Sequence, residues 1–153
     1  MATQDFSHEL TVTASPELTW TVLTDVDRLA SWVGIVHDVT EISQLERYTA
    51  VLLDRVGPFK LKADLQVNVK VVTEGQEVEV EASGRDRAVD SRIAVRARLR
   101  LSPTDSGGST IETDGRYEVT GRVASMGSGV IQKKADRVLE DFFSKAALEL
   151  GTP

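Results

Sequence analysis

The sequence contains no cysteine, which excludes disulfide bonds, thiolate nucleophiles and metal sites with cysteine ligands. Histidine is nearly absent as well. His8 and His37 stand far apart, so there is no histidine-rich metal motif and we expect no metal ion or other cofactor. No stretch approaches the ~18 apolar residues of a membrane span, and the N-terminus lacks the basic start and apolar run of a signal peptide. These absences predict a cytoplasmic protein with at most peripheral membrane association.

The composition is that of an ordinary globular protein. Of its 153 residues, 41% are hydrophobic and 27% are charged, and this length suits one domain over residues 1–153 with a real core. The formal charge of −6 argues against a general affinity for nucleic acids. No glycine-rich nucleotide loop follows a predicted strand. We therefore expect a single domain that binds no nucleic acid.

The middle of the chain alternates apolar and polar residues with great regularity. Between Lys60 and Val71 every odd position is apolar and every even position is polar. Such alternation is typical of a strand with one buried face and one solvated face, and hence of an antiparallel sheet. The predicted strands are residues 6–12, 36–45, 48–56, 60–71, 78–84, 93–101 and 111–119.

Two short helices follow the first predicted strand. Ser15, Pro16 and Glu17 form a helix start, because serine caps free amide groups, proline suits the first position and glutamate complements the helix dipole. This helix is predicted to run to about Thr24. A second short helix is predicted to end at Trp32.

Residues 121–150 carry apolar side chains at steps of three and four, the spacing of one face of a single long helix. The half around Leu139 and Phe142 is bulky, whereas the half around Gly127 and Gly129 is small. The buried face of the predicted sheet also has small residues among larger ones. Small residues facing small residues predict an internal cavity beside the first half of this helix.

Four arginines lie on the solvated face of one predicted strand: Arg92, Arg96, Arg98 and Arg100. The neighbouring predicted strands carry glutamates and aspartates on the same face. Cross-strand pairs of opposite charge stabilise a sheet by roughly 0.2–1 kcal/mol each. No aromatic residues stand among the arginines to stack on bases. We predict a neutralised outer face rather than a nucleic-acid site.

The order of elements predicts an α+β helix-grip (START/Bet v 1-like) fold. It has a curved antiparallel sheet of about seven strands, two short helices after the first strand and a long C-terminal helix across the sheet. Three segments carry a more specific resemblance. They are Ala14-Ser15-Pro16-Glu17 with Trp20, Tyr48-Thr49-Ala50 leading into Val56-Gly57-Pro58-Phe59-Lys60, and Met126-Gly127-Ser128 through Ala135-Asp136 to Phe142-Phe143. With these segments the chain resembles the carbon monoxide dehydrogenase G (CoxG-like) family of the SRPBCC superfamily.

This resemblance implies a non-catalytic accessory role for an aerobic carbon monoxide dehydrogenase-type molybdenum hydroxylase, in maturation or in coupling to a membrane or electron acceptor. The fold implies binding of a hydrophobic small molecule, and we expect a quinone or a lipid. Two alternatives stay open: a polyketide cyclase- or aromatase-like enzyme on the same fold, and an adaptor that acts through its surface without a ligand. His8 could serve such an enzyme as a general acid or base. Without a positioned partner for it, we assign no catalytic residue.

We expect thirteen residues to form the binding site. Trp32 and Phe59 would close its mouth, while the hydroxyls of Thr113 and Tyr117 would orient an oxygen atom of the ligand. Filling the gap with Gly127→Leu is expected to abolish binding. The predicted ligand-binding residues are Trp32, Phe59, Leu61, Leu65, Ala82, Gly84, Ala97, Thr113, Gly115, Tyr117, Met126, Gly127 and Val130.

Overall fold

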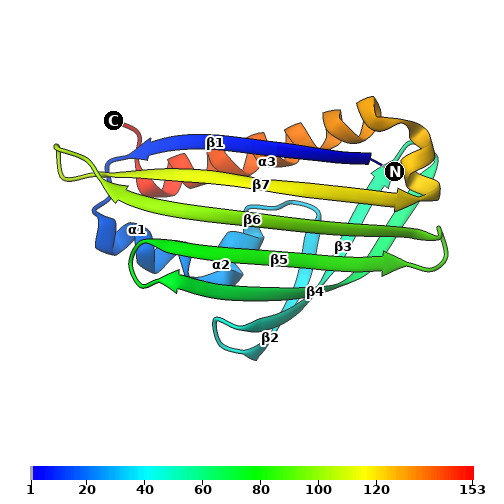
Figure 1. The fold of residues 1–153 in the computed structure, drawn as a ribbon, viewed down its shortest axis with the longest axis horizontal. Helices are drawn as coiled ribbons and strands as arrows, with labels where there is room; N and C mark the ends of the chain where they lie inside the picture. The colour runs from blue at the N-terminus through cyan, green and yellow to red at the C-terminus, as the bar shows by residue number, and fades with distance from the viewer. Residues whose placement is uncertain (1) are drawn as a thin grey trace.

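The computed structural model describes residues 2–153 as a seven-stranded antiparallel sheet with helices (Figure 1). The strands lie in the order β1-β7-β6-β5-β4-β3-β2, and each pairs with its neighbours in antiparallel fashion. The elements are β1 (Ala2–Val12), α1 (Pro16–Leu23), α2 (Val26–Ser31), β2 (Val36–Ser43), β3 (Arg47–Val56), β4 (Phe59–Thr73), β5 (Glu77–Asp86), β6 (Ser91–Pro103), β7 (Ser109–Gly121), the 3₁₀ helix η1 (Arg122–Met126) and α3 (Ser128–Leu150). This arrangement confirms the predicted helix-grip fold.

The alternation in the sequence decides which face of each strand is buried. In β4 the odd residues Leu61, Ala63 and Leu65 are buried, and the even residues between them are exposed. Leu65 lies opposite Gly84 of β5, so the apolar sets of neighbouring strands share one face. A register shift of one residue would turn each apolar set toward solvent. The pattern therefore specifies the register as well as the strand.

The two short helices begin where side chains cap their free amide groups. Ser15 Oγ accepts a hydrogen bond from the Leu18 N–H at 3.2 Å, as the sequence predicts for the start of α1. Asp25 caps α2 in the same way, accepting from the Arg28 N–H at 3.3 Å. The α2 helix then ends at Ser31, with Trp32 as its C-cap. These caps place α2 next to the edge strand β2.

The C-terminal segment differs from the predicted single helix, because two glycines break it. Gly121 has φ 90° and Gly127 has φ 99°, both in the left-handed region that other residues avoid. Between them the chain forms η1, whose Val123 is buried and donates its N–H to Ser91 Oγ at 3.0 Å. The long helix α3 therefore starts at Ser128 and not at Gly121. Neither α3 nor the other helices within residues 2–153 combine the length and apolar character that crossing a membrane requires.

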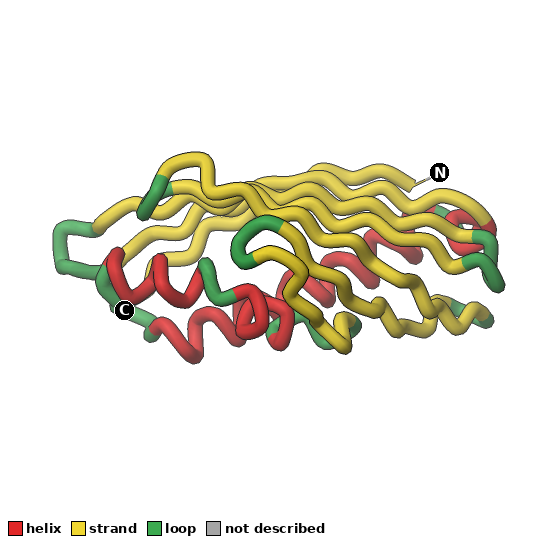
Figure 2. Tube along the Cα trace, turned by 90° about the horizontal axis from the view of Figure 1, so that it is seen from below, coloured by secondary structure: helices red, strands yellow, loops and turns green. Residues whose placement is uncertain are grey.

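The helices lie on the same side of the sheet (Figure 2), and the space between them and the sheet holds two clusters of buried residues. The first cluster lies where α1, α2 and the end of α3 meet the sheet, and includes Val12, Val22, Val78, Leu99, Ile111 and Leu150. The second cluster lies where η1 and the start of α3 meet the sheet, and includes Val56, Leu61, Ala63, Val119, Val123 and Ile131.

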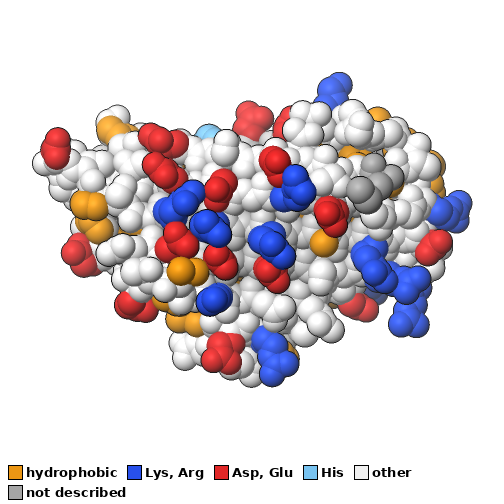
Figure 3. All heavy atoms as spheres, viewed as in Figure 1, with side chains coloured by type: hydrophobic (Ala, Val, Ile, Leu, Met, Phe, Trp, Pro, Cys, Tyr) orange, Lys and Arg blue, Asp and Glu red, His pale blue; other side chains and the backbone are white. Residues whose placement is uncertain are grey.

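The opposite face of the sheet is covered with charges of both signs (Figure 3). Arg96 Nε lies 3.0 Å from Glu81 Oε1, and Arg98 Nη2 lies 3.1 Å from Glu79 Oε1. Arg100 pairs with the Asp114 carboxylate at 3.2 Å. These ion pairs confirm the prediction that the outer face is neutralised across neighbouring strands.

Candidate functional site

A cavity of about 310 Å³ lies between the sheet and the helices. Its volume is at the lower end of the range for small-molecule sites. The sheet contributes one wall, formed by inward side chains of β3 to β7, and the opposite wall comes from α2, the segment after it and the second half of α3. The sheet wall includes Leu65, Val67, Val80, Ala82, Val95 and Ala97, and the opposite wall includes Val26, Leu29, Val33, Ile35, Val138, Leu139, Phe142 and Phe143. The lining is almost entirely apolar, so the cavity suits a hydrophobic molecule.

The cavity lies beside the bulky half of α3, the reverse of the position that the sequence predicts. In the first half of the helix, Ile131 and Ala135 pack in the second cluster against Leu61 and Ala63 of the sheet. No cavity lies beneath this half, although its side chains are the smaller ones. In the second half, Phe142 and its neighbours border the cavity. The bulky half of the helix is therefore the one that lines the cavity.

One polar atom in the cavity has no partner. Thr113 lines it from β7, is only 6% exposed, and its Oγ1 makes no hydrogen bond to any residue in 2–153. Leaving a buried hydroxyl unpaired costs about 1–3 kcal/mol. A ligand oxygen or nitrogen placed beside it would remove that cost. Thr113 therefore gives an otherwise apolar cavity one point of polar recognition.

The other polar side chain in the cavity lining belongs to Tyr48. Its hydroxyl accepts a hydrogen bond from the Leu45 N–H at 2.7 Å, which closes the turn between β2 and β3. The lining thus contains no carboxylate, histidine or lysine that could act on a bound molecule. Within residues 2–153 there is also no group of three or more metal-ligating side chains. The cavity lining among the described residues therefore includes no acid–base pair of the kind that a cyclase uses.

Four of the thirteen predicted site residues line the cavity: Leu65, Ala82, Ala97 and Thr113. The others lie elsewhere. Phe59, Leu61, Tyr117 and Met126 belong to the second cluster or pack against it. Gly84 and Gly115 lie on the inner face, opposite Ile93 and Ala97 respectively. Whether any of the thirteen binds a ligand stays a prediction.

The remaining three lie at the ends of the helices. Trp32 is 2% exposed and packs in the first cluster, where its ring lies edge-on to Phe142. Val130 is 43% exposed at the start of α3. Gly127 precedes that helix at φ 99°, and a Cβ atom there would have no heavy atom within 4 Å. Gly127→Leu therefore cannot fill the cavity, and would strain the backbone instead.

The wall formed by α2 and β2 is absent from the site that the sequence predicts. Val26, Leu29, Ala30 and Val33 line the cavity, and their positions follow the steps of three and four that mark one face of a helix. That signal is present in the sequence, but the helix is only six residues long. Val36 and Val39 of β2 were missed because their strand alternates less regularly.

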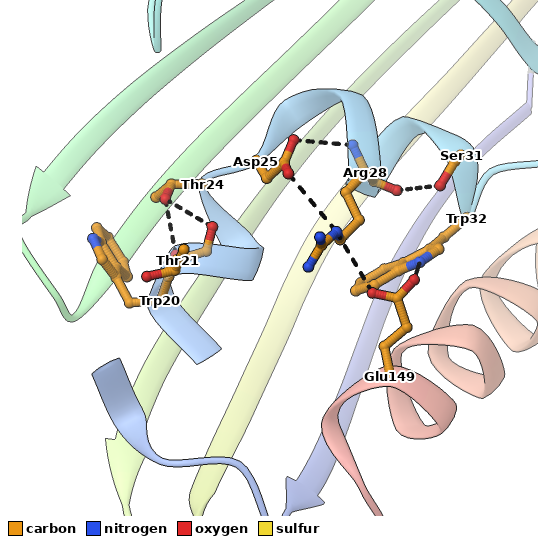
Figure 4. A network of polar contacts seen from close by, with 8 residues as sticks. All are labelled: Trp20, Thr21, Thr24, Asp25, Arg28, Ser31, Trp32 and Glu149. Atoms are coloured by element: carbon orange, nitrogen blue, oxygen red, sulfur yellow. Dashed lines mark hydrogen bonds and ion pairs between the residues drawn. The ribbon is translucent and has the colours of Figure 1, made fainter. Parts of the chain in front are cut away.

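Polar contacts fasten α2 to the end of α3 (Figure 4). Trp32 Nε1 donates to Glu149 Oε1 at 3.2 Å, and Arg28 Nε lies 3.7 Å from Glu149 Oε2. Arg28 also pairs with Asp25 at 3.7 Å. The ion pairs are about half exposed and contribute little on their own. With the buried Trp32 ring they keep α2 in place as a wall of the cavity.

A separate groove of about 370 Å³ runs between β1 and α3. It shares Phe6, Leu139 and Phe143 with the cavity, so these three side chains border both spaces. Tyr117 lines the groove and not the cavity, so its hydroxyl does not join that of Thr113 as the sequence predicts. Burial raises the pKa of Tyr117, and the nearby Asp136 carboxylate raises it further.

A further hollow, of about 620 Å³, lies on the outer face of the sheet. Its charged side chains are already paired: Arg116 Nε lies 2.7 Å from Asp5 Oδ1, and Arg98 pairs with Glu79. This hollow is an open part of the solvated face. The apolar cavity, which has an unpartnered hydroxyl, is the better candidate for a ligand site.

Comparison with known proteins gives a family and a fold. The family of the carbon monoxide dehydrogenase G subunit (CoxG) matches residues 9–151. No curated protein sequence matches the chain. Among solved structures, a conserved protein from Geobacillus kaustophilus superimposes with a TM-score of 0.82 at 19% identity, over 96% of this chain and 95% of that one.

Two further structures belong to proteins with informative descriptions. A START superfamily protein from Mycobacterium smegmatis gives a TM-score of 0.65 at 12% identity, over 96% of this chain and 99% of that one. Norcoclaurine synthase from Thalictrum flavum was solved in complex with dopamine and hydroxybenzaldehyde. It gives a TM-score of 0.60 at 18% identity, over 99% of this chain and 90% of that one. At these identities the similarity establishes the fold and nothing more.

Proposed function

The chain belongs to the carbon monoxide dehydrogenase G (CoxG) family, and we propose that it binds a hydrophobic small molecule without transforming it. The observation that carries this proposal is the apolar cavity of about 310 Å³ with a single unpartnered hydroxyl. An apolar cavity with one or two placed polar groups is the usual form of a small-molecule site. The lack of a titratable pair in the lining favours binding over cyclase chemistry.

The proposed ligand has an apolar body and at least one oxygen atom, as a quinone or a lipid has. The apolar body lies against the sheet wall, where Leu65, Ala82 and Ala97 are the predicted contacts. The oxygen atom pairs with Thr113 Oγ1 at the β7 side of the cavity. The helices α2 and α3 cover the other side of the apolar body, because their side chains supply the opposite wall.

The family suggests where such a binding protein acts. We propose an accessory role beside a carbon monoxide dehydrogenase-type molybdenum hydroxylase, in its maturation or in coupling it to a membrane or electron acceptor. This part of the proposal depends on the family alone, because the cavity identifies a class of ligand and not a partner protein. We place this role in the cytoplasm and in a single domain spanning residues 1–153.

Native mass spectrometry of the purified protein, followed by organic extraction, tests the binding proposal. We expect a co-purifying quinone or lipid near one-to-one, or stabilisation in a thermal shift assay when such molecules are added. A ligand at about one hundred times its dissociation constant stabilises the folded state by about 2.7 kcal/mol. A protein that is empty and gains no stability from a panel of quinones and lipids would contradict the proposal.

A matched pair of variants locates the site. Ala97 points into the cavity from β6, whereas Ala94 of the same strand lies on the outer face. We expect Ala97→Phe to fill the cavity and abolish binding, because the ring takes the space of the ligand. Ala94→Phe makes the same chemical change on the other face and is expected to leave binding unchanged. Equal binding by both variants would place the ligand outside the cavity.

A further inference from the structure

We propose that the groove between β1 and α3 is a second binding site, selective for an organic ammonium ion such as an alkylamine or a quaternary ammonium group. The groove has a volume of about 370 Å³ and lies outside the apolar cavity. Its floor is formed by Phe6, Tyr117, Leu139 and Phe143. This site is independent of the cavity and of the function proposed above.

The groove has unpaired negative charge on one wall. Asp136 and Glu140 both line it from α3, and residues four apart lie on the same face of a helix. Neither carboxylate forms an ion pair with a residue in 2–153, unlike Asp5 at the groove's edge, which pairs with Arg116. No lysine or arginine lines the groove. Two free carboxylates at one side of an apolar floor favour a cation that also has apolar surface.

Tyr117 provides a second and independent observation. The residue as a whole is 7% exposed, its side chain lines the groove, and no hydrogen bond to its hydroxyl is found within residues 2–153. Burial and the charge of Asp136 both raise the pKa of Tyr117, so the hydroxyl is protonated at neutral pH and its oxygen is free to accept. An N–H group of an amine placed between Tyr117 and Asp136 would satisfy both.

Aromatic rings complete the recognition. Phe6, Tyr117 and Phe143 are all part of the floor, and the His8 ring stacks on Phe143 with centroids 3.9 Å apart. Cations are attracted to the faces of aromatic rings, and quaternary ammonium groups are recognised in this way. A bare metal ion fits less well, because residues 2–153 contain no group of three carboxylate or histidine ligands. The chemistry therefore points to an organic cation.

The test compares three probes with the same hexyl chain: hexylammonium, hexan-1-ol and hexanoate. Binding is followed by ¹H–¹⁵N chemical-shift titration, which also shows where each probe binds. We expect the ammonium probe to bind at least about fivefold more tightly than the alcohol, the effect of one nearby charge in water. Its shifts should centre on residues 4–8 and 136–143, and hexanoate should bind most weakly of the three.

Variants separate the carboxylates of the groove from the general charge of the protein. Asp136→Asn and Glu140→Gln are each expected to weaken binding of the ammonium probe by about fivefold. Asp141→Asn removes the same charge from the same helix at an exposed position that does not line the groove, and should change binding little. Equal effects of all three variants, or an alcohol that binds as tightly as the ammonium, would overturn the proposal.

Ala97→Phe distinguishes this site from the cavity. We expect this variant to bind hexylammonium normally, because Ala97 lines the cavity and not the groove. Loss of ammonium binding in Ala97→Phe would place the probe in the cavity and overturn the second site. An empty cavity together with intact ammonium binding would instead contradict the proposed function alone.

Discussion

The two halves of α3 cover the same sheet, yet the space beneath the first half is filled, whereas residues 138–143 of the second half border a hollow. Beneath the first half, Ile131 and Ala135 pack with Leu61, Ala63 and Val123 in the second cluster. Beneath the second half, Leu139 and Phe142 border a cavity of about 310 Å³. The half with smaller side chains is the solid one. The size of the side chains on one element does not by itself predict where a cavity lies.

The physical reason is that the distance between a helix and a sheet is adjustable. Small side chains let the two layers approach until they touch, since protein interiors pack to a uniform high density. Large side chains hold the layers apart, and any space that they do not fill is left empty. In this molecule α2 then closes the open side of that space with Val26, Leu29 and Val33.

Truncation on the two halves of α3 should give the largest contrast. Ile131 is 5% exposed in the filled half, so we expect Ile131→Ala to lower the free energy of unfolding by about 2–5 kcal/mol. Leu139 is only partly buried and borders empty space, so Leu139→Ala should cost only about 1 kcal/mol. Urea denaturation of both variants measures the difference. Similar losses would mean that the two halves are equally well packed.

The next largest effect on stability is expected from a change at Asp86. Its carboxylate accepts the Lys62 N–H at 2.8 Å and the Val89 N–H at 3.1 Å, which ties β4 to the turn between β5 and β6. Asp86→Ala should lower the free energy of unfolding by about 1.5–3 kcal/mol, because it leaves these donors unpaired. Asp86 does not line the cavity, so ligand binding should be unchanged.

The pH dependence of stability provides a check on Asp86. Burial alone raises the pKa of its carboxyl, but hydrogen bonds from the backbone N–H groups of Lys62, Val89 and Ala88 outweigh burial and lower the pKa below the ordinary 3.8. The stabilisation is therefore present above about pH 3.8 and is lost as the pH falls through the lower folded-state pKa. Denaturation between about pH 2 and pH 6 should show a shallower acid loss in Asp86→Asn. If the loss of stability at low pH were the same in this variant as in the wild type, Asp86 would not be the group that causes it.

The smallest expected effect is a gain in stability rather than a loss, and it concerns the cavity. Thr113→Val replaces an unpartnered buried hydroxyl with a methyl group of similar shape, so the ligand-free protein should gain about 1 kcal/mol of stability. The same variant should weaken binding of an oxygen-bearing ligand by about tenfold, the effect of one lost hydrogen bond. Thermal denaturation without ligand and titration with ligand measure the two effects. A stable variant that binds as well as the wild type would show that Thr113 does not contact the ligand.

The sequence predicted the order of the strands and α-helices correctly, although not the 3₁₀ helix η1, and specific residues explain why. The alternation in β4 identifies its buried face, because a strand has a period of two, and Ser15 marks the start of α1 through its cap. Arg96 and Arg98 form ion pairs with glutamates of the neighbouring strand, because antiparallel pairing brings matching positions together. These features depend on residues that are close in sequence or on adjacent strands.

The lining of the cavity was predicted less completely. Thr113, Leu65, Ala82 and Ala97 line the cavity as part of the inner face, which the alternation reveals. Tyr117 has the same pattern but lies under α3, at the groove. The wall from α2 was missed, although Val26 and its neighbours have helical spacing, because nothing in the sequence indicates that a six-residue helix faces the sheet.

The sequence by itself determined the strands, their buried faces, the helix caps and the balance of charge on the outer face. These are local properties, since each depends on the period of one element or on the pairing of two neighbours. Only the tertiary structure decided where the cavity lies, which hydroxyl is left without a partner and which carboxylates face the groove. Those features depend on how far α3 stands from the sheet at each point, and packing among many distant residues sets that distance.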